Sequence, residues 1–138
     1  MNLSRSSENR LRRTLQANAG FSLLSATCFI FAAPPVAALT GIQAIPEIQF
    51  VGYSLLVFGL FLIGLTARKS RPLPAKVVGG IIVADYGWVF GSIAGLVLWG
   101  AQLTSAGWWI VTEISILVGA FATLQARFLR TRAVTAAS

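Results

Sequence analysis

Four long apolar stretches constrain this sequence more than any other feature. They are bounded by charged residues, proline or glycine, and they cover residues 15–33, 48–67, 77–99 and 108–126. The hydrocarbon core of a bilayer is about 30 Å thick, and roughly 20 apolar residues of helix cross it. None of the stretches alternates apolar with polar residues, as the strands of a membrane β-barrel do. We therefore predict an all-α polytopic membrane protein, in which four transmembrane helices form an antiparallel bundle and residues 1–138 form a single membrane domain.

The composition excludes several classes of protein. Only 11% of the 138 residues are charged, whereas soluble domains carry about 25%. One cysteine and no histidine exclude an internal disulfide and remove the commonest ligand of haem and catalytic zinc. No nucleophile, general base or metal cluster occurs at a useful spacing. We therefore expect no cofactor, no metal site and no enzymatic activity.

The positive charges predict the orientation of the spans. All 11 Lys and Arg residues lie before the first span, between the second and third, or after the fourth. Cytoplasmic loops are enriched in Lys and Arg, so both termini are expected in the cytoplasm, with the protein in the inner (cytoplasmic) membrane of a bacterium. The net charge of +7 is explained by this topology and by anionic lipid headgroups, so we do not expect nucleic-acid binding. The basic residues are Arg5, Arg10, Arg12, Arg13, Arg68, Lys69, Arg71, Lys76, Arg127, Arg130 and Arg132.

The loop between the first two spans is apolar and uncharged until Glu47. Pro34 and Pro35 suit the first turn of a helix, and Gly41 suits a helix end. We predict a short helix at about residues 35–41 that lies on the outer membrane interface. The alternative function for this loop is a lid or a partner-docking surface.

Ionisable groups inside a membrane are costly, and they are therefore candidates for function. Two occur here, Asp85 in the third span and Glu113 in the fourth. Trp88 and Ser92 share the helical face of Asp85, and the Trp88 indole N–H is a possible donor to the carboxylate. The two acids could be structural hydrogen-bonding groups, parts of a transport or proton pathway, or elements that recognise a partner.

The first span carries a matching polar face. Asn18, Ser22 and Ser25 follow helical spacing, and Ser22 lies roughly 10 Å below the cytoplasmic edge, close to the depth of Asp85. We hypothesise that this face is turned toward the third span and hydrogen-bonds the Asp85 side chain.

Small residues mark candidate helix-packing faces. Gly87, Gly91 and Gly95 repeat the GxxxG spacing that allows close helix approach, on a face about 90° from Asp85. This pattern predicts that the third span is the central packing helix. Ser115 and Gly119 begin a small face on the fourth span, and Glu113 points almost opposite to it.

The segments 17–22 (ANAGFS) and 84–92 (ADYGWVFGS) resemble a scattered group of small bacterial integral membrane proteins. These proteins have about this length and an A-D-x-x-W-V-x-G-S pattern in the third helix. The resemblance implies a four-helix bacterial membrane protein, in which Asp85, Trp88, Gly91 and Ser92 define the pattern. It implies no activity, because the group carries none that is assigned.

These observations favour a non-enzymatic membrane protein that acts as an accessory or scaffold subunit of a membrane assembly. Its expected partners are the lipid bilayer and either another membrane protein or further copies of itself. The alternative is a small homo-oligomeric transporter or channel that uses Asp85 and Glu113 as protonatable sites.

Overall fold

The structure is a computed structural model that describes residues 2–68 and 71–137. These residues form five α-helices and one 3-10 helix, and they contain no β-strand. Lys69, one of the basic residues behind the predicted orientation, and its neighbour Ser70 lie outside the described residues. The elements are α1 (Asn2–Phe31), α2 (Ala33–Thr40), α3 (Ile45–Ala67), α4 (Ala75–Trp99), η1 (Gly100–Gln102) and α5 (Ser105–Ala137).

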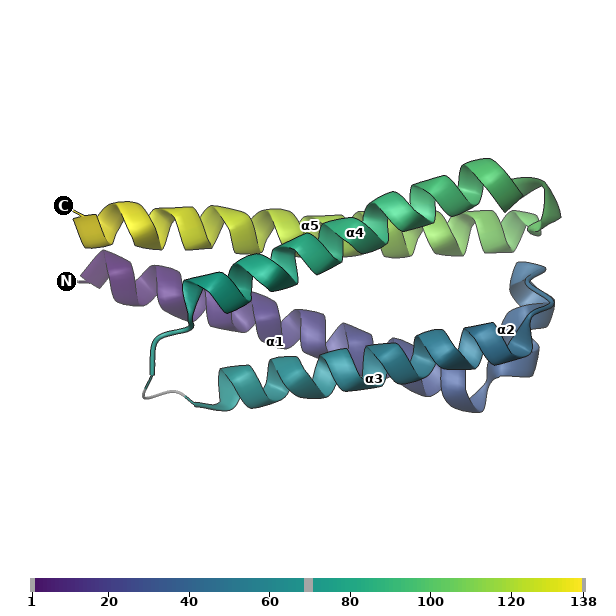
Figure 1. The fold of residues 1–138 in the computed structure, drawn as a ribbon, viewed down its shortest axis with the longest axis horizontal. Helices are drawn as coiled ribbons and strands as arrows, with labels where there is room; N and C mark the ends of the chain where they lie inside the picture. The colour runs from purple at the N-terminus through teal and green to yellow at the C-terminus, as the bar shows by residue number, and fades with distance from the viewer. Residues whose placement is uncertain (1, 69–70, 138) are drawn as a thin grey trace.

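Four helices of the described chain, α1, α3, α4 and α5, are long and apolar enough to cross a membrane. The prediction of an all-α chain with four such helices is therefore confirmed. All four are longer than the predicted spans, and the two longest are α1 with 30 residues and α5 with 33. At 1.5 Å per residue these two extend about 45–50 Å, well beyond the thickness of a hydrocarbon core. Both chain termini lie at one end of the molecule, and α2 and η1 lie at the other (Figure 1).

The central helix of the bundle is α1. It packs against α3 on one side and α5 on the other, whereas the main packing partner of α4 is α5 (Figure 1). The prediction that the third span is the central packing helix is therefore wrong. The face of α4 that is buried carries Val78, Ile81 and Asp85, so bulky residues and the acid, rather than the glycines, face the bundle.

Two glycines of α3 permit its close approach to α1. A Cβ atom added to Gly59 would lie 2.8 Å from the Leu23 side chain, and one added to Gly52 would lie 2.9 Å from the side chain of Ile30. Nearer the termini, α1 and α3 meet the start of α4 in a leucine-rich core that includes Leu11 and other buried residues. The other members of this core are Leu15, Ala19, Leu62, Leu73, Val78 and Ile81.

The far end of the bundle is closed by α2, a helix close to the predicted range 35–41. Its prolines occupy the first turn, and it ends at Gly41, which adopts φ +83°. The backbone then meets the start of α5, where Thr104 N–H donates to the Thr40 carbonyl at 3.0 Å. A side chain on Gly107 would collide with the Thr40 backbone, so α2 can dock here only against a glycine.

Candidate functional site

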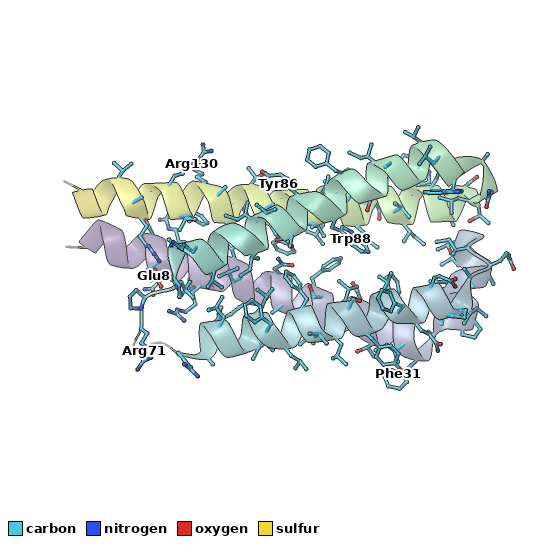
Figure 2. All side chains as sticks on the ribbon, in the orientation of Figure 1. Glu8, Phe31, Arg71, Tyr86, Trp88 and Arg130 are labelled. Carbon is cyan, nitrogen blue, oxygen red and sulfur yellow. The ribbon has the colours of Figure 1, made fainter. Side chains whose placement is uncertain are left out.

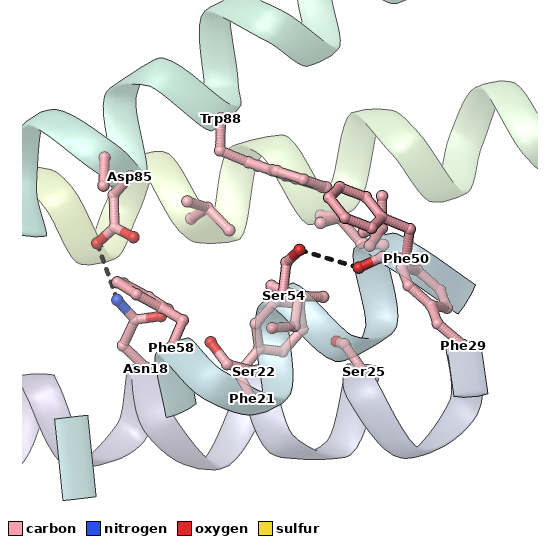
Figure 3. A pocket seen from close by; sticks show the side chains of 15 residues that line it. Asn18, Phe21, Ser22, Ser25, Phe29, Phe50, Ser54, Phe58, Asp85 and Trp88 are labelled. Carbon is pink, nitrogen blue, oxygen red and sulfur yellow. Dashed lines mark hydrogen bonds between the residues drawn. The ribbon is translucent and has the colours of Figure 1, made fainter. Parts of the chain in front are cut away.

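Asp85 is held by amide groups from two other helices. It is 4% exposed, and its Oδ2 atom accepts hydrogen bonds from Asn18 Nδ2 of α1 at 2.8 Å and from Gln125 Nε2 of α5 at 3.1 Å. Figure 3 shows the Asn18 bond crossing from α1 to α4. The hypothesis that the polar face of the first span bonds Asp85 is therefore confirmed for Asn18.

Sequence reasoning missed Gln125. Its side chain is fully buried, and its Oε1 atom has no hydrogen-bond partner among the described residues. Gln125 lies one residue from the end of the predicted span 108–126 and two before Arg127, a position typical of a membrane interface. Its helical spacing from the small residues Ser115 and Ala122 is the signal that could have identified it as inward-facing.

A cleft of about 300 Å³ adjoins Asp85, and we call it the Asp85 cleft. Its lining comes from α1, α3, α4 and α5, and it is largely apolar. Ser22, Ser25 and Ser54 add hydroxyl groups to it (Figure 3). Ser22 and Ser25 thus share the cleft with Asp85, but within the described chain the hydrogen bonds to Asp85 come from Asn18 and Gln125 instead. The cleft's aromatic side chains are Phe21, Phe29, Phe50, Phe58 and Trp88.

Trp88 also lines the Asp85 cleft but donates no hydrogen bond to the carboxylate, contrary to the possibility considered from sequence. A second hollow of about 240 Å³ continues from it toward α2 and shares Trp88 as a lining residue. Ser92 and Glu47 line this continuation. The face of α4 that carries Asp85, Trp88 and Ser92 therefore borders two neighbouring hollows, which share Trp88.

Glu113 lies elsewhere on the molecule. It is exposed on α5 and lines neither the Asp85 cleft nor its continuation. The two intramembrane acids identified from sequence therefore do not share a cavity.

A second polar network lies at the end of the bundle that holds both termini. The Glu8 side chain of α1 accepts from Leu73 N–H at 2.9 Å and pairs with Arg132 of α5 at 2.6 Å. Arg12, which is 7% exposed, pairs with Glu8 at 3.3 Å and donates to the Thr66 carbonyl at 2.7 Å. Figure 2 shows Glu8 near the chain ends, close to Arg71. From the sequence, the arginines are interpreted only as topology determinants. Glu8 and Arg12 are four residues apart, but their other partners, Thr66, Leu73 and Arg132, are distant along the chain, so most of this network could not be predicted.

The small-residue faces have different environments. Gly80, Ala84, Gly87, Gly91 and Gly95 form a stripe that we call the glycine face of α4. A Cβ atom added to any of its glycines meets no atom within 4 Å. On α5, by contrast, Ser115 is buried, and a Cβ on Gly119 would contact Val89 of α4 at 3.7 Å. The small face of α5 is thus used inside the bundle, and the glycine face of α4 is open.

Within the described part of the chain, no three His, Cys, Asp or Glu side chains are grouped so that they could hold a metal ion. No protein-family model matches the chain, and no curated protein or solved structure matches it. The relation to small bacterial membrane proteins with an A-D-x-x-W-V-x-G-S pattern therefore stays a prediction.

Proposed function

We propose that this chain is a non-enzymatic accessory or scaffold subunit, which binds a transmembrane helix of another membrane protein through the glycine face of α4. The observation that carries the proposal is that the glycines of this face have open space beside them. Glycine costs a helix about 1 kcal/mol per residue relative to alanine. In membranes this cost is offset where a second backbone packs closely on the glycines, and an apolar helix is the occupant that such a face accommodates.

We further propose that the four long helices cross the cytoplasmic membrane of a bacterium in antiparallel order, with both termini in the cytoplasm. The positive-inside rule supports this orientation, because Arg71 and Arg130 lie toward the same end of the bundle as both termini (Figure 2). Single cysteines at the exposed residues Ser6 and Gln102, in a Cys28→Ala background, test it with a membrane-impermeant maleimide added to intact cells. Labelling of Gln102→Cys alone is expected, and labelling of Ser6→Cys alone would reverse the orientation.

The scaffold proposal is tested by native mass spectrometry of the protein extracted from its own membrane in mild detergent. The wild-type chain is expected to copurify with a partner protein in a fixed stoichiometry. The Gly91→Leu variant is expected to be recovered without that partner. Gly64→Leu is the matched control, because Gly64 is an exposed glycine of α3 that also has open space beside it. Equal partner recovery from both variants would contradict the proposal.

A small transporter is the second candidate function, and the position of Asp85 beside a cleft favours it. Glu113 adds no support, because it lies outside that cleft. A proton flux across proteoliposome membranes that is lost in Asp85→Asn and kept in Glu113→Gln would favour this candidate over the scaffold.

A further inference from the structure

The Asp85 cleft has the charge of a cation-binding site. Asp85 lies at one end of the hollow, and Glu47 lines the continuation toward α2. No Lys or Arg is among the described residues that line either part. Asp85 is buried whereas Glu47 is exposed, so the Asp85 carboxylate is the group that most strongly favours a positively charged occupant.

The two oxygens of Asp85 have different environments. Both hydrogen bonds from the described residues, those of Asn18 and Gln125, go to Oδ2. Figure 3 shows the other oxygen turned away from Asn18. Glu8 differs, because Arg12 and Arg132 bind its two oxygens and neutralise its charge. Among the described residues, therefore, Asp85 has no donor to its second oxygen and no cationic partner.

Aromatic rings supply the rest of the recognition chemistry. Phe50, Phe58 and Trp88 line the cleft together with Asp85 (Figure 3). The faces of aromatic rings attract ammonium groups, most strongly where water is excluded. A cleft of about 300 Å³ lies at the lower end of the size range of ligand pockets, which is about 300–1,000 Å³.

From the combination of carboxylate, rings and volume, we propose that the Asp85 cleft binds a small hydrophobic organic cation. Its positive group pairs with the free oxygen of Asp85, and its apolar body lies against Phe50, Phe58 and Trp88. Since α3 packs mainly on α1 and α4 mainly on α5, the ligand can enter between α3 and α4 from the bilayer. The proposal is independent of the docking role of α4, because none of the glycines of the glycine face lines the cleft, although Ala84 of that face does.

The test compares benzyltrimethylammonium with neopentylbenzene, its neutral isostere, on the full chain in lipid nanodiscs. Trp88 becomes the only fluorescent indole when Trp99, Trp108 and Trp109 are replaced by phenylalanine, so a change in its emission reports occupancy of the cleft. We expect the cation to bind about tenfold or more tightly than the isostere, because only the cation is attracted by the Asp85 carboxylate and by the faces of the aromatic rings. Asp85→Asn is expected to remove this preference, and Glu113→Gln is expected to keep it.

Each outcome decides the proposal. Equal affinity for the two probes, or no change in Trp88 emission with either, would overturn the proposal even before the Asp85 and Glu113 variants are measured. A preference for the cation that survives Asp85→Asn would also overturn it, because the charge would then act from elsewhere. Tighter binding of neopentylbenzene would identify the cleft as a site for neutral lipid chains. The melting temperature of the Trp88-only protein, compared with that of the wild type, verifies that the background is folded.

Discussion

Of the four long apolar helices, the first and the third, α1 and α4, differ most in how they pack in the bundle. In the most apolar 18-residue stretch of each helix, 28% of the residues of α1 are buried but only 11% of those of α4. α1 lies between α3 and α5, and α4 rests mainly on α5. The glycines that pack against α1 also differ from those of α4. The glycines of α3 that face α1 are in tight contact with it, whereas those on the glycine face of α4 have open space beside them. A glycine motif therefore identifies a face able to pack closely, but it does not say which partner fills it.

The contrast between tightly packed and open glycines is tested most strongly by placing a leucine side chain on a glycine of each kind. Gly59→Leu should lower the free energy of unfolding by about 3 kcal/mol, because overpacking a tight contact costs that much and a Cβ atom alone would lie 2.8 Å from Leu23. Thermal unfolding in detergent, monitored by circular dichroism, measures the loss. A stable Gly59→Leu variant would show that α1 and α3 are not tightly packed.

Glu8 tests whether α1 also organises the end of the bundle that holds both termini. Glu8→Ala removes hydrogen bonds to Arg12, Arg132 and the Leu73 backbone. Hydrogen bonds to charged groups contribute about 1.5–3 kcal/mol each, and partial exposure reduces this value, so a net loss of about 2 kcal/mol is expected. The matched control is Glu113→Ala, an exposed acid on α5, which should change stability little. Equal melting temperatures for the two variants would show that the Glu8 network does not stabilise the bundle.

Asp85 is the link between α4 and α1, and its replacements separate hydrogen bonding from charge. Asp85→Leu leaves the amide groups of Asn18 and Gln125 without an acceptor. We expect a loss of about 1–2 kcal/mol, since side-chain hydrogen bonds between membrane helices contribute about 0.6 kcal/mol each and at most about 1.7. Asp85→Asn retains an acceptor oxygen and should lose less than half as much. Equal stability of the two variants in a thermal-shift assay would argue against the pairing.

The sequence predicted the helices well because their length and apolarity are local properties. The four apolar stretches and the short helix before Gly41 followed from patterns within single segments. The pairing of Asn18 with Asp85 followed from polar residues at matching depths in two spans. The predictions that were wrong or missing concern which helices are neighbours in the bundle. The place of α1 at the centre, Gln125 at Asp85 and the Glu8 network each require contacts between residues far apart in the chain.

The smallest expected effect is that of Gly91→Leu on the isolated protein. No atom lies within 4 Å of a Cβ built at Gly91, so the free energy of unfolding should change by no more than about 0.5 kcal/mol, as at other surface positions. Thermal unfolding of the purified chain measures this. A loss as large as that of Gly59→Leu would mean that the glycine face is covered within the chain itself.

The most direct test of a docking role for α4 is photo-crosslinking in the native membrane. A photoreactive amino acid is placed at Gly91 in one variant and at Gly64, an exposed glycine of α3, in another. A docked partner helix predicts one discrete, stoichiometric product from position 91 and none from position 64. No product from position 91, or the same products from both positions, would contradict the claim that the glycine face of α4 binds a partner.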